Sequence, residues 1–189
     1  SRIQAANEPL YAALQFAVLG NYLDFAALQG QVSFDQLDDM LDKALEMPLD
    51  RDCYEAFMQD LSQAQRLVYL TDNAGEIVFD RIFAETLKAA FPRLEITFCV
   101  RGEPVHNDAT REDAIAAGIT FPVIDSGSNI GGTELTKLSS EAKTALDRAD
   151  VIIAKGMGNT ESMFGCGKNV YYAFLVKCAR FRQFFNKPQ

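Results

Sequence analysis

The spacing of apolar residues predicts helices for the first third of the chain. Residues 9–28 carry apolar side chains at helical spacing, interrupted at Gly20, which predicts two helices that meet at this glycine. Residues 33–46, with Ser33 as the expected N-cap, and residues 52–63 continue the helical pattern. The chain is therefore predicted to begin with a helical segment.

From residue 66 onward, short apolar runs rich in β-forming residues alternate with amphipathic stretches. The predicted strands are residues 67–70, 96–100, 122–124, 151–154 and 171–176, and the predicted helices are residues 76–91, 111–117 and 135–149. Such alternation is typical of a mainly parallel sheet with helices on both faces. The prediction is an α/β protein, a three-layer α/β/α fold with a mainly parallel, doubly wound sheet, preceded by a helical N-terminal segment. Its expected parts are a helical segment at residues 1–65 and an α/β core at residues 66–189.

Each predicted strand is followed by a polar or glycine-rich segment. These segments are residues 71–76, 101–110, 125–133, 155–159 and 177–178. Asp, Asn and Gly are common in ordinary turns, so one such loop alone says little about function. Ligands of doubly wound sheets bind outside the carboxyl ends of the strands, however, so five polar loops at one edge favour a binding site.

The loops after the first two strands supply the oxygen donors of a metal ion. Asp72, Asn73 and Asp108 offer two carboxylates and an amide carbonyl, which suit Mg²⁺ or Mn²⁺ more than zinc. The alternative is that Asp72 closes a turn and Asp108 caps the helix that opens near Thr110. Glu76, one turn after Asp72, either positions an attacking water or favours the helix N-terminus electrostatically. These four acidic and amide residues are the expected catalytic group.

The loop after the fourth strand combines a cation with glycines. Lys155 is followed by Gly156, Gly158 and Asn159, so that a charged side chain stands beside accessible backbone amides. This combination can hold a phosphate from several sides. We therefore expect all four residues to bind substrate phosphate.

Two further cations are expected near the same edge. Lys177 follows a very apolar run and needs an anionic partner, which is either a phosphate or a structural carboxylate, unless its ammonium group reaches the surface. Arg101 either binds phosphate or orients Asp72 or Asp108. The sequence alone does not separate these roles.

The composition narrows the class of partner. A net charge of -8 and an isoelectric point near 4.7 argue against a protein whose main role is binding nucleic acid or an anionic membrane surface. No apolar run approaches the roughly 20 residues of a membrane-spanning helix, and no secretory leader is recognised. The four cysteines form no CxxC motif, and the single His106 cannot complete a zinc cluster. We expect a cytoplasmic protein with reduced thiols, and its oligomeric state stays open.

The ordered set of polar segments resembles the metal-dependent damage-control phosphatase family, in its prokaryotic branch. The segments that carry the resemblance are residues 72–76, 101–104, 107–110, 155–159 and 177–178, together with 20–25 and 127–133. The resemblance implies an α/β/α fold with a helical N-terminal part and a Mn²⁺, Mg²⁺, Co²⁺ or Ni²⁺ ion on Asp72, Asn73 and Asp108. It also implies phosphatase activity on small phosphometabolites, such as sugar phosphates or damaged phosphorylated metabolites. Lys155, the loop through Asn159, and Lys177 match the positions that contact substrate phosphate. Members are usually longer, with extra N-terminal helices and often a cysteine pair there, and this sequence has neither.

The expected reaction is hydrolysis of a phosphate ester, with a metal ion between a phosphate oxygen and water and with Lys155 and Lys177 neutralising charge. A covalent phosphoryl group on Asp72 is the alternative route. Two other functions stay open. One is a cofactor-dependent transferase, such as a carboxyl methyltransferase, with an adenosine pocket at residues 125–133. The other is a non-catalytic protein that binds a metal ion or a phosphometabolite.

Overall fold

Five parallel strands form one sheet in the order β3-β2-β1-β4-β5. They are β1 (Arg66–Leu70), β2 (Glu95–Val100), β3 (Val123–Asp125), β4 (Val151–Lys155) and β5 (Val170–Ala173). The computed structural model describes residues 2–28 and 34–175. The strand order runs from β1 to β3 in one direction and from β4 to β5 in the other, so the direction reverses between β1 and β4. The predicted doubly wound parallel sheet is confirmed.

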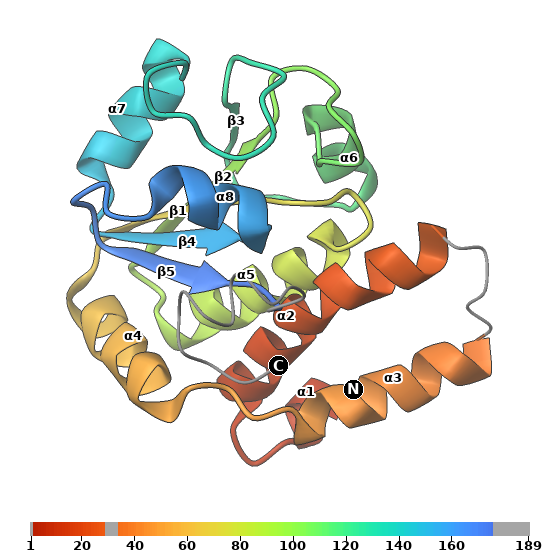
Figure 1. Ribbon diagram of the computed structural model, residues 1–189. Coiled ribbons are helices and arrows are strands. Elements are labelled where there is room, and N and C mark those ends of the chain that lie inside the picture. Colours follow the sequence, from red (N-terminus) through yellow and green to blue (C-terminus); the bar gives the residue numbers. More distant parts are fainter. Residues whose placement is uncertain (1, 29–33, 176–189) are drawn as a thin grey trace.

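Helices cover both faces of this sheet. They are α1 (Arg2–Ala5), α2 (Pro9–Leu28), α3 (Phe34–Glu46), α4 (Arg51–Gln63), α5 (Ile77–Ala90), α6 (Arg111–Ala116), α7 (Ser140–Arg148) and α8 (Gly156–Met163). Figure 1 shows α7 and α8 on one side of the sheet and α2, α4 and α5 on the other. The predicted three-layer α/β/α architecture is therefore confirmed.

The central strands are buried on both sides, which explains why their sequences are continuous apolar runs. In β1, Leu67 and Tyr69 join the hydrophobic cluster under α2, α4 and α5, whereas Val68 and Leu70 join the cluster under α7 and α8. Successive strand residues point to opposite faces, so an apolar run without alternation fits a strand between two helical layers. The two resulting cores hold the sheet edge in a fixed position.

Helix α2 is one continuous helix, so the predicted break at Gly20 is wrong. A Cβ atom at this position would lie 2.8 Å from the Cβ of Glu76 and 3.3 Å from a ring carbon of Phe79. Glycine is thus needed here for close packing of α2 on α5, and the helix tolerates its cost of roughly 1 kcal/mol because the packing compensates. The glycine marks a helix contact and not a helix end.

Other boundaries differ from the prediction in smaller ways. Helix α7 begins at Ser140, because Ser139 is its N-cap and accepts a hydrogen bond from the backbone N–H of Ala142 (3.1 Å). The segment that follows β4, predicted as a loop, is the start of α8. The expected N-cap Ser33 and the end of the last predicted strand at residue 176 lie outside the described residues.

The N-terminal helices share a core with the sheet. Leu10 of α2 and Phe57 of α4 belong to the same cluster as Tyr69 of β1. The division of the chain at residue 65 stays a prediction, and within the described residues the two parts bury one common surface. In that part of the chain, no helix is long and apolar enough to cross a membrane.

Candidate functional site

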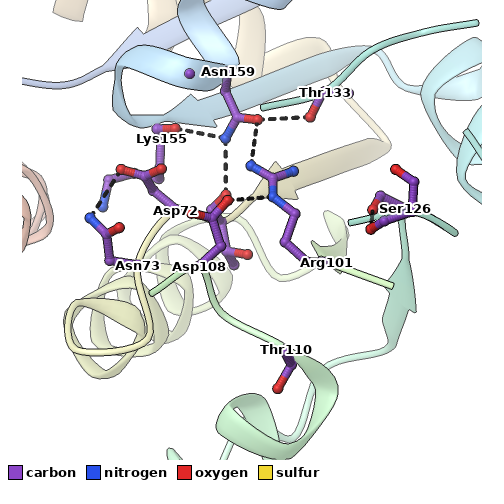
Figure 2. A network of polar contacts seen from close by, with 12 residues as sticks. Asp72, Asn73, Arg101, Asp108, Thr110, Ser126, Thr133, Lys155 and Asn159 are labelled. Atoms are coloured by element: carbon purple, nitrogen blue, oxygen red, sulfur yellow. Dashed lines mark hydrogen bonds and ion pairs between the residues drawn. The ribbon is translucent and has the colours of Figure 1, made fainter. Parts of the chain in front are cut away.

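The candidate site lies where the strand order reverses. Strands β1 and β4 are neighbours at this point, with Asp72 just after the end of β1 and Gly156 just after the end of β4. Ligands of doubly wound sheets bind at this switch point, in the crevice beyond the carboxyl ends of the strands. Figure 2 shows the polar side chains that gather there.

The loops after β1 and β2 are joined through their backbones. Asn73 and Asp108 form an isolated antiparallel bridge, and the N–H of Ala109 donates to the carbonyl oxygen of Asp72 (2.7 Å). The N–H of Ala74 also donates to the carbonyl oxygen of Asn107 (2.8 Å). The three residues predicted as metal ligands are therefore brought together by main-chain hydrogen bonds between two loops that are separate in sequence.

Arg101 fixes the carboxylate of Asp108. Its Nε donates to Asp108 Oδ2 at 2.6 Å, and the two side chains are only 2% and 10% exposed. Asp108 does not cap the following helix, because Thr110 is the N-cap of α6 and forms a capping box with Asp113. Of the two roles considered for Arg101, the geometry shows the orienting one.

The side chain of Asn159 makes four hydrogen bonds within the protein. Its Nδ2 donates to the carbonyl oxygens of Thr71 (2.9 Å) and Lys155 (2.7 Å), while its Oδ1 accepts from Arg101 Nη2 (3.1 Å) and Thr133 Oγ1 (2.8 Å). These bonds use both donor hydrogens and both acceptor positions of the amide. In this structure the side chain of Asn159 ties together the loops that form the site, and the predicted contact of Asn159 with a substrate phosphate stays a prediction.

Lys155 lies beneath the site and not at its surface. Its Nζ donates to Glu76 Oε2 and Asp80 Oδ1, both at 2.6 Å, and all three side chains are 0% exposed. Glu76 Oε1 in turn accepts from the backbone N–H (3.1 Å) and the Nδ2 (2.8 Å) of Asn73. The partners of Lys155 within the protein are thus two carboxylates, and Glu76 also holds Asn73. The predicted contact of Lys155 with a substrate phosphate stays a prediction.

The two glycines at the start of α8 allow close approach of other groups. Gly156 has φ of +77°, and a Cβ atom here would collide with the carboxylate of Asp72. At Gly158, a Cβ atom would lie 3.4 Å from the backbone nitrogen of Gly132. Gly156 makes room for Asp72 beside the first turn of α8, and the predicted contact of both glycines with a substrate phosphate stays a prediction.

The site carries more negative than positive charge. The pKa of Asp72 is raised to about 7. Burial is the largest cause, and the negative charges of Glu76 and Asp108 add to the rise, whereas Lys155 and Arg101 oppose it. Among the described side chains of this group, the carboxylates of Asp72, Glu76, Asp80 and Asp108 face the cations Arg101 and Lys155. With all four acids ionised, four carboxylates against two cations give an excess of two negative charges. An unbalanced buried charge is costly, so the group must take up protons or a cation.

The donor set fits a hard divalent cation. Asn73 donates its Nδ2 to Glu76 Oε1 (2.8 Å) and to Asp72 Oδ2 (3.2 Å), so its Oδ1 is left to act as a ligand beside the carboxylates of Asp72 and Asp108. Oxygen donors of this kind suit Mg²⁺ or Mn²⁺. Within residues 2–28 and 34–175, no three His, Cys, Asp or Glu side chains form a metal cluster, so any ion here relies on the amide as well as the two acids. Lys177, predicted to bind phosphate, lies outside the described residues.

Sequence reasoning missed Asp80 and Tyr69. The hydroxyl of Tyr69 donates to Asp80 Oδ1 at 2.8 Å, and the pKa of Asp80 is raised to about 6 by burial, with Lys155 opposing that rise and Glu76 adding to it. Asp80 stands four residues after Glu76, on the same face of α5. An acidic residue on the apolar face of an amphipathic helix was the signal that could have revealed it.

The fold and the site together define a doubly wound α/β protein with a buried group of acidic side chains at its switch point. Comparison with known protein families identifies the family. The chain belongs to the family of the damage-control phosphatase ARMT1-like domain, whose family model matches residues 1–189. The resemblance seen in the sequence is confirmed.

Three archaeal relatives and one solved structure place the chain within this family. An uncharacterized protein of Methanocaldococcus jannaschii, MJ0202, is 37% identical over 85% of this chain and 54% of its own length. Damage-control phosphatases of Pyrococcus horikoshii and Archaeoglobus fulgidus are each 32% identical, over 88% and 93% of this chain and 58% and 61% of their own lengths. The crystal structure of a DUF89 family protein from Pyrococcus horikoshii superposes with a TM-score of 0.85 at 30% identity, and covers 95% of this chain and 63% of that one. The chain thus spans less than two thirds of the length of these relatives.

Proposed function

We propose that this protein is a phosphatase that hydrolyses small phosphorylated metabolites with a divalent ion held by Asp72, Asn73 and Asp108. The observation that carries the proposal is the excess of two negative charges in a buried group at the switch point. A divalent cation balances that excess, and two relatives named damage-control phosphatases support the type of reaction. Mn²⁺ and Mg²⁺ are the first candidates, and Co²⁺ or Ni²⁺ also accept such donors.

Each residue around the ligands has a defined task in this proposal. A bound divalent ion supplies positive charge for a phosphate oxygen and activates water. Arg101 keeps Asp108 in place through its 2.6 Å contact, and Glu76 keeps Asn73 in place through two hydrogen bonds. Because these contacts are buried, the ligands need little reorganisation when the ion arrives.

The phosphate of the substrate needs positive charge that is not already in use. Arg101 and Lys155 are engaged by carboxylates within the protein. We therefore assign the phosphate to the ion, to the backbone N–H groups in the first turn of α8, and to Lys177. This assignment keeps the predicted role of Gly156 and Gly158 through their backbone N–H groups, with Asp72 packed against Gly156.

Release of inorganic phosphate tests the proposal. Purified protein is incubated with p-nitrophenyl phosphate and with Mn²⁺, Mg²⁺, Co²⁺, Ni²⁺ or EDTA. We expect phosphate release that depends on the ion, is lost in Asp108→Asn, and is unchanged in Asp39→Asn, an exposed aspartate on α3. Because Asp39 lies on a helix away from the strand ends, it controls for the loss of one negative charge.

Other results would point to the alternatives. Binding of Mn²⁺ by calorimetry without turnover on any of a panel of phosphometabolites would indicate a non-catalytic binding protein. Binding of a methyl donor without phosphate release would favour a transferase. A phosphoryl group trapped on Asp72 and detected by mass spectrometry would show that the aspartate, and not water, attacks the substrate.

A further inference from the structure

We infer that Asp80, anchored by Tyr69, is a positioning residue for the ion site. It sets the place of Lys155, which fixes Glu76, which in turn directs Asn73 toward the ion. The inference rests on the proposed function, because the ion itself is proposed. It adds to that function two residues that lie behind the ligands and touch neither the ion nor the substrate.

The outer end of this chain of contacts is rigid. The hydroxyl of Tyr69 donates to Asp80 Oδ1 at 2.8 Å. The ring of Tyr69 is completely buried in the centre of β1, stacked on Phe98 with ring centroids 4.9 Å apart and set edge-on to Phe83 at 6.3 Å. A side chain held by aromatic packing on two sides gives Asp80 a fixed partner.

The inner end of the chain reaches a ligand. Lys155 Nζ lies between Asp80 Oδ1 and Glu76 Oε2, at 2.6 Å from each. Glu76 uses its other oxygen to accept the Nδ2 of Asn73 at 2.8 Å. That contact decides which side of the Asn73 amide faces outward, so a shift of Lys155 would be passed to the ligand through one glutamate.

Charge acts in the same direction as geometry. The ammonium group of Lys155 lowers the pKa of Asp72, which shows that its field reaches the ligand. Asp80 offsets much of this positive charge before a cation arrives. Without the carboxylate of Asp80, Lys155 would repel the ion more strongly, since interactions between buried charges are only weakly screened.

Asp80 is poorly suited to a purely structural role. Its Oδ2 is buried and has no hydrogen-bond partner within the described part of the chain. A buried carboxylate with one unpartnered oxygen lowers stability, so this arrangement is costly for folding alone. Its contact with the buried Lys155 at 2.6 Å makes Asp80 part of the charged group that supports the site.

Two variants and two matched controls test the inference. Asp80→Asn removes the charge and Tyr69→Phe removes the anchoring hydroxyl. The controls are Asp60→Asn and Tyr171→Phe, because the Tyr171 hydroxyl donates to Asp60 at 2.7 Å in the same way. That control pair lies near the amino ends of β4 and β5, where Asn169 links Asp60 to the carbonyl oxygen of Asp150, and so at the opposite edge of the sheet.

The readouts are the Kd for Mn²⁺ by calorimetry and the unfolding temperature in EDTA. We expect Asp80→Asn to weaken Mn²⁺ binding about tenfold or more, as is typical for residues behind metal ligands. Tyr69→Phe should weaken it by a smaller factor, because Asp80 keeps its contact with Lys155 in that variant. The unfolding temperature of Asp80→Asn in EDTA should be equal to or above that of the wild type. Both controls should bind Mn²⁺ as the wild type does.

The outcomes separate this inference from the proposed function. If the wild type binds no Mn²⁺, the proposed ion site is wrong and the inference falls with it. If the wild type binds Mn²⁺ and Asp80→Asn binds it equally well, only the inference is overturned. This holds also when Asp80→Asn unfolds at a lower temperature than the wild type but keeps the same Kd for Mn²⁺. Should Asp80→Asn fail to fold, the Kd of Tyr69→Phe decides, and a wild-type value overturns the inference.

Discussion

The substitution Asp72→Asn should stabilise the metal-free protein at neutral and alkaline pH. Asp72 is mostly buried beside Glu76 and Asp108, and its pKa lies at about 7 in place of the usual 3.8. A raised pKa of an acid means that the folded state binds the proton more tightly than the unfolded state does. The contribution of Asp72 to stability is therefore most favourable below pH 4 and is lost as the pH rises through about 7.

The size of the effect follows from the two pKa values. Each pKa unit corresponds to about 1.4 kcal/mol, so ionisation of Asp72 costs the metal-free fold up to about 4 kcal/mol above pH 7. Asparagine has nearly the same shape and no charge to desolvate. We expect the variant to exceed the wild type by up to that amount at pH 8, by a smaller amount at pH 6, and by almost nothing near pH 4.

Urea unfolding in EDTA, followed by circular dichroism between pH 4 and 8, measures this difference. The sequence contains no tryptophan, so fluorescence is the weaker probe. Asp39→Asn serves as the control for the loss of one negative charge at an exposed position away from the site. Added Mn²⁺ should reverse the order, since only the wild type gains stability from binding. If Asp72→Asn is less stable than the wild type at pH 8 in EDTA, then the ionised Asp72 does not destabilise the metal-free protein, and the reasoning is wrong.

Three further predictions concern the ion and its ligands. The affinity for Mn²⁺ should fall by up to about tenfold per pH unit below pH 7, because protons compete for Asp72. Calorimetry at several pH values measures this, and an affinity that does not change with pH would contradict the prediction. Gly156→Ala should abolish Mn²⁺ binding and lower the free energy of unfolding by more than about 1 kcal/mol, because the new Cβ collides with the Asp72 carboxylate at a φ of +77°; wild-type affinity in calorimetry would refute this. Arg101→Lys keeps the charge but cannot hold both Asp108 and Asn159, so steady-state kinetics at saturating Mn²⁺ should show kcat reduced about tenfold or more with KM little changed. A raised KM with unchanged kcat would instead mean that Arg101 contacts the substrate phosphate.

The sheet and the position of the site could be predicted because both follow from local sequence. A run such as Leu67–Leu70 is apolar at every position because the strand is covered on both faces, and the loop after it is polar because it lies at the ligand-binding edge. Asp72 and Asn73 therefore stand out without any knowledge of the fold.

The partners of the cations could not be predicted in the same way. Lys155 is 79 residues from Glu76 in sequence and 75 from Asp80, and the hydrogen bond from Asn159 to Thr71 spans 88 residues. A lysine after a strand reads as a phosphate contact when the carboxylates that neutralise it are not visible. Gly20 misled the prediction for a similar reason, because the need for glycine came from α5, more than 50 residues away.

The contact between Gly20 and Glu76 ties the helical segment to the chemistry of the site. Because α2 covers Glu76 at this glycine, the segment keeps water away from a glutamate that is 0% exposed and paired with Lys155. In a fragment that began at β1, that ion pair would be exposed to water, and the effective dielectric constant around Asp72, Asn73 and Asp108 would rise. The N-terminal helices thus shield the ion pair of Glu76 and Lys155 from water, and dividing the chain at residue 65 would remove that shield.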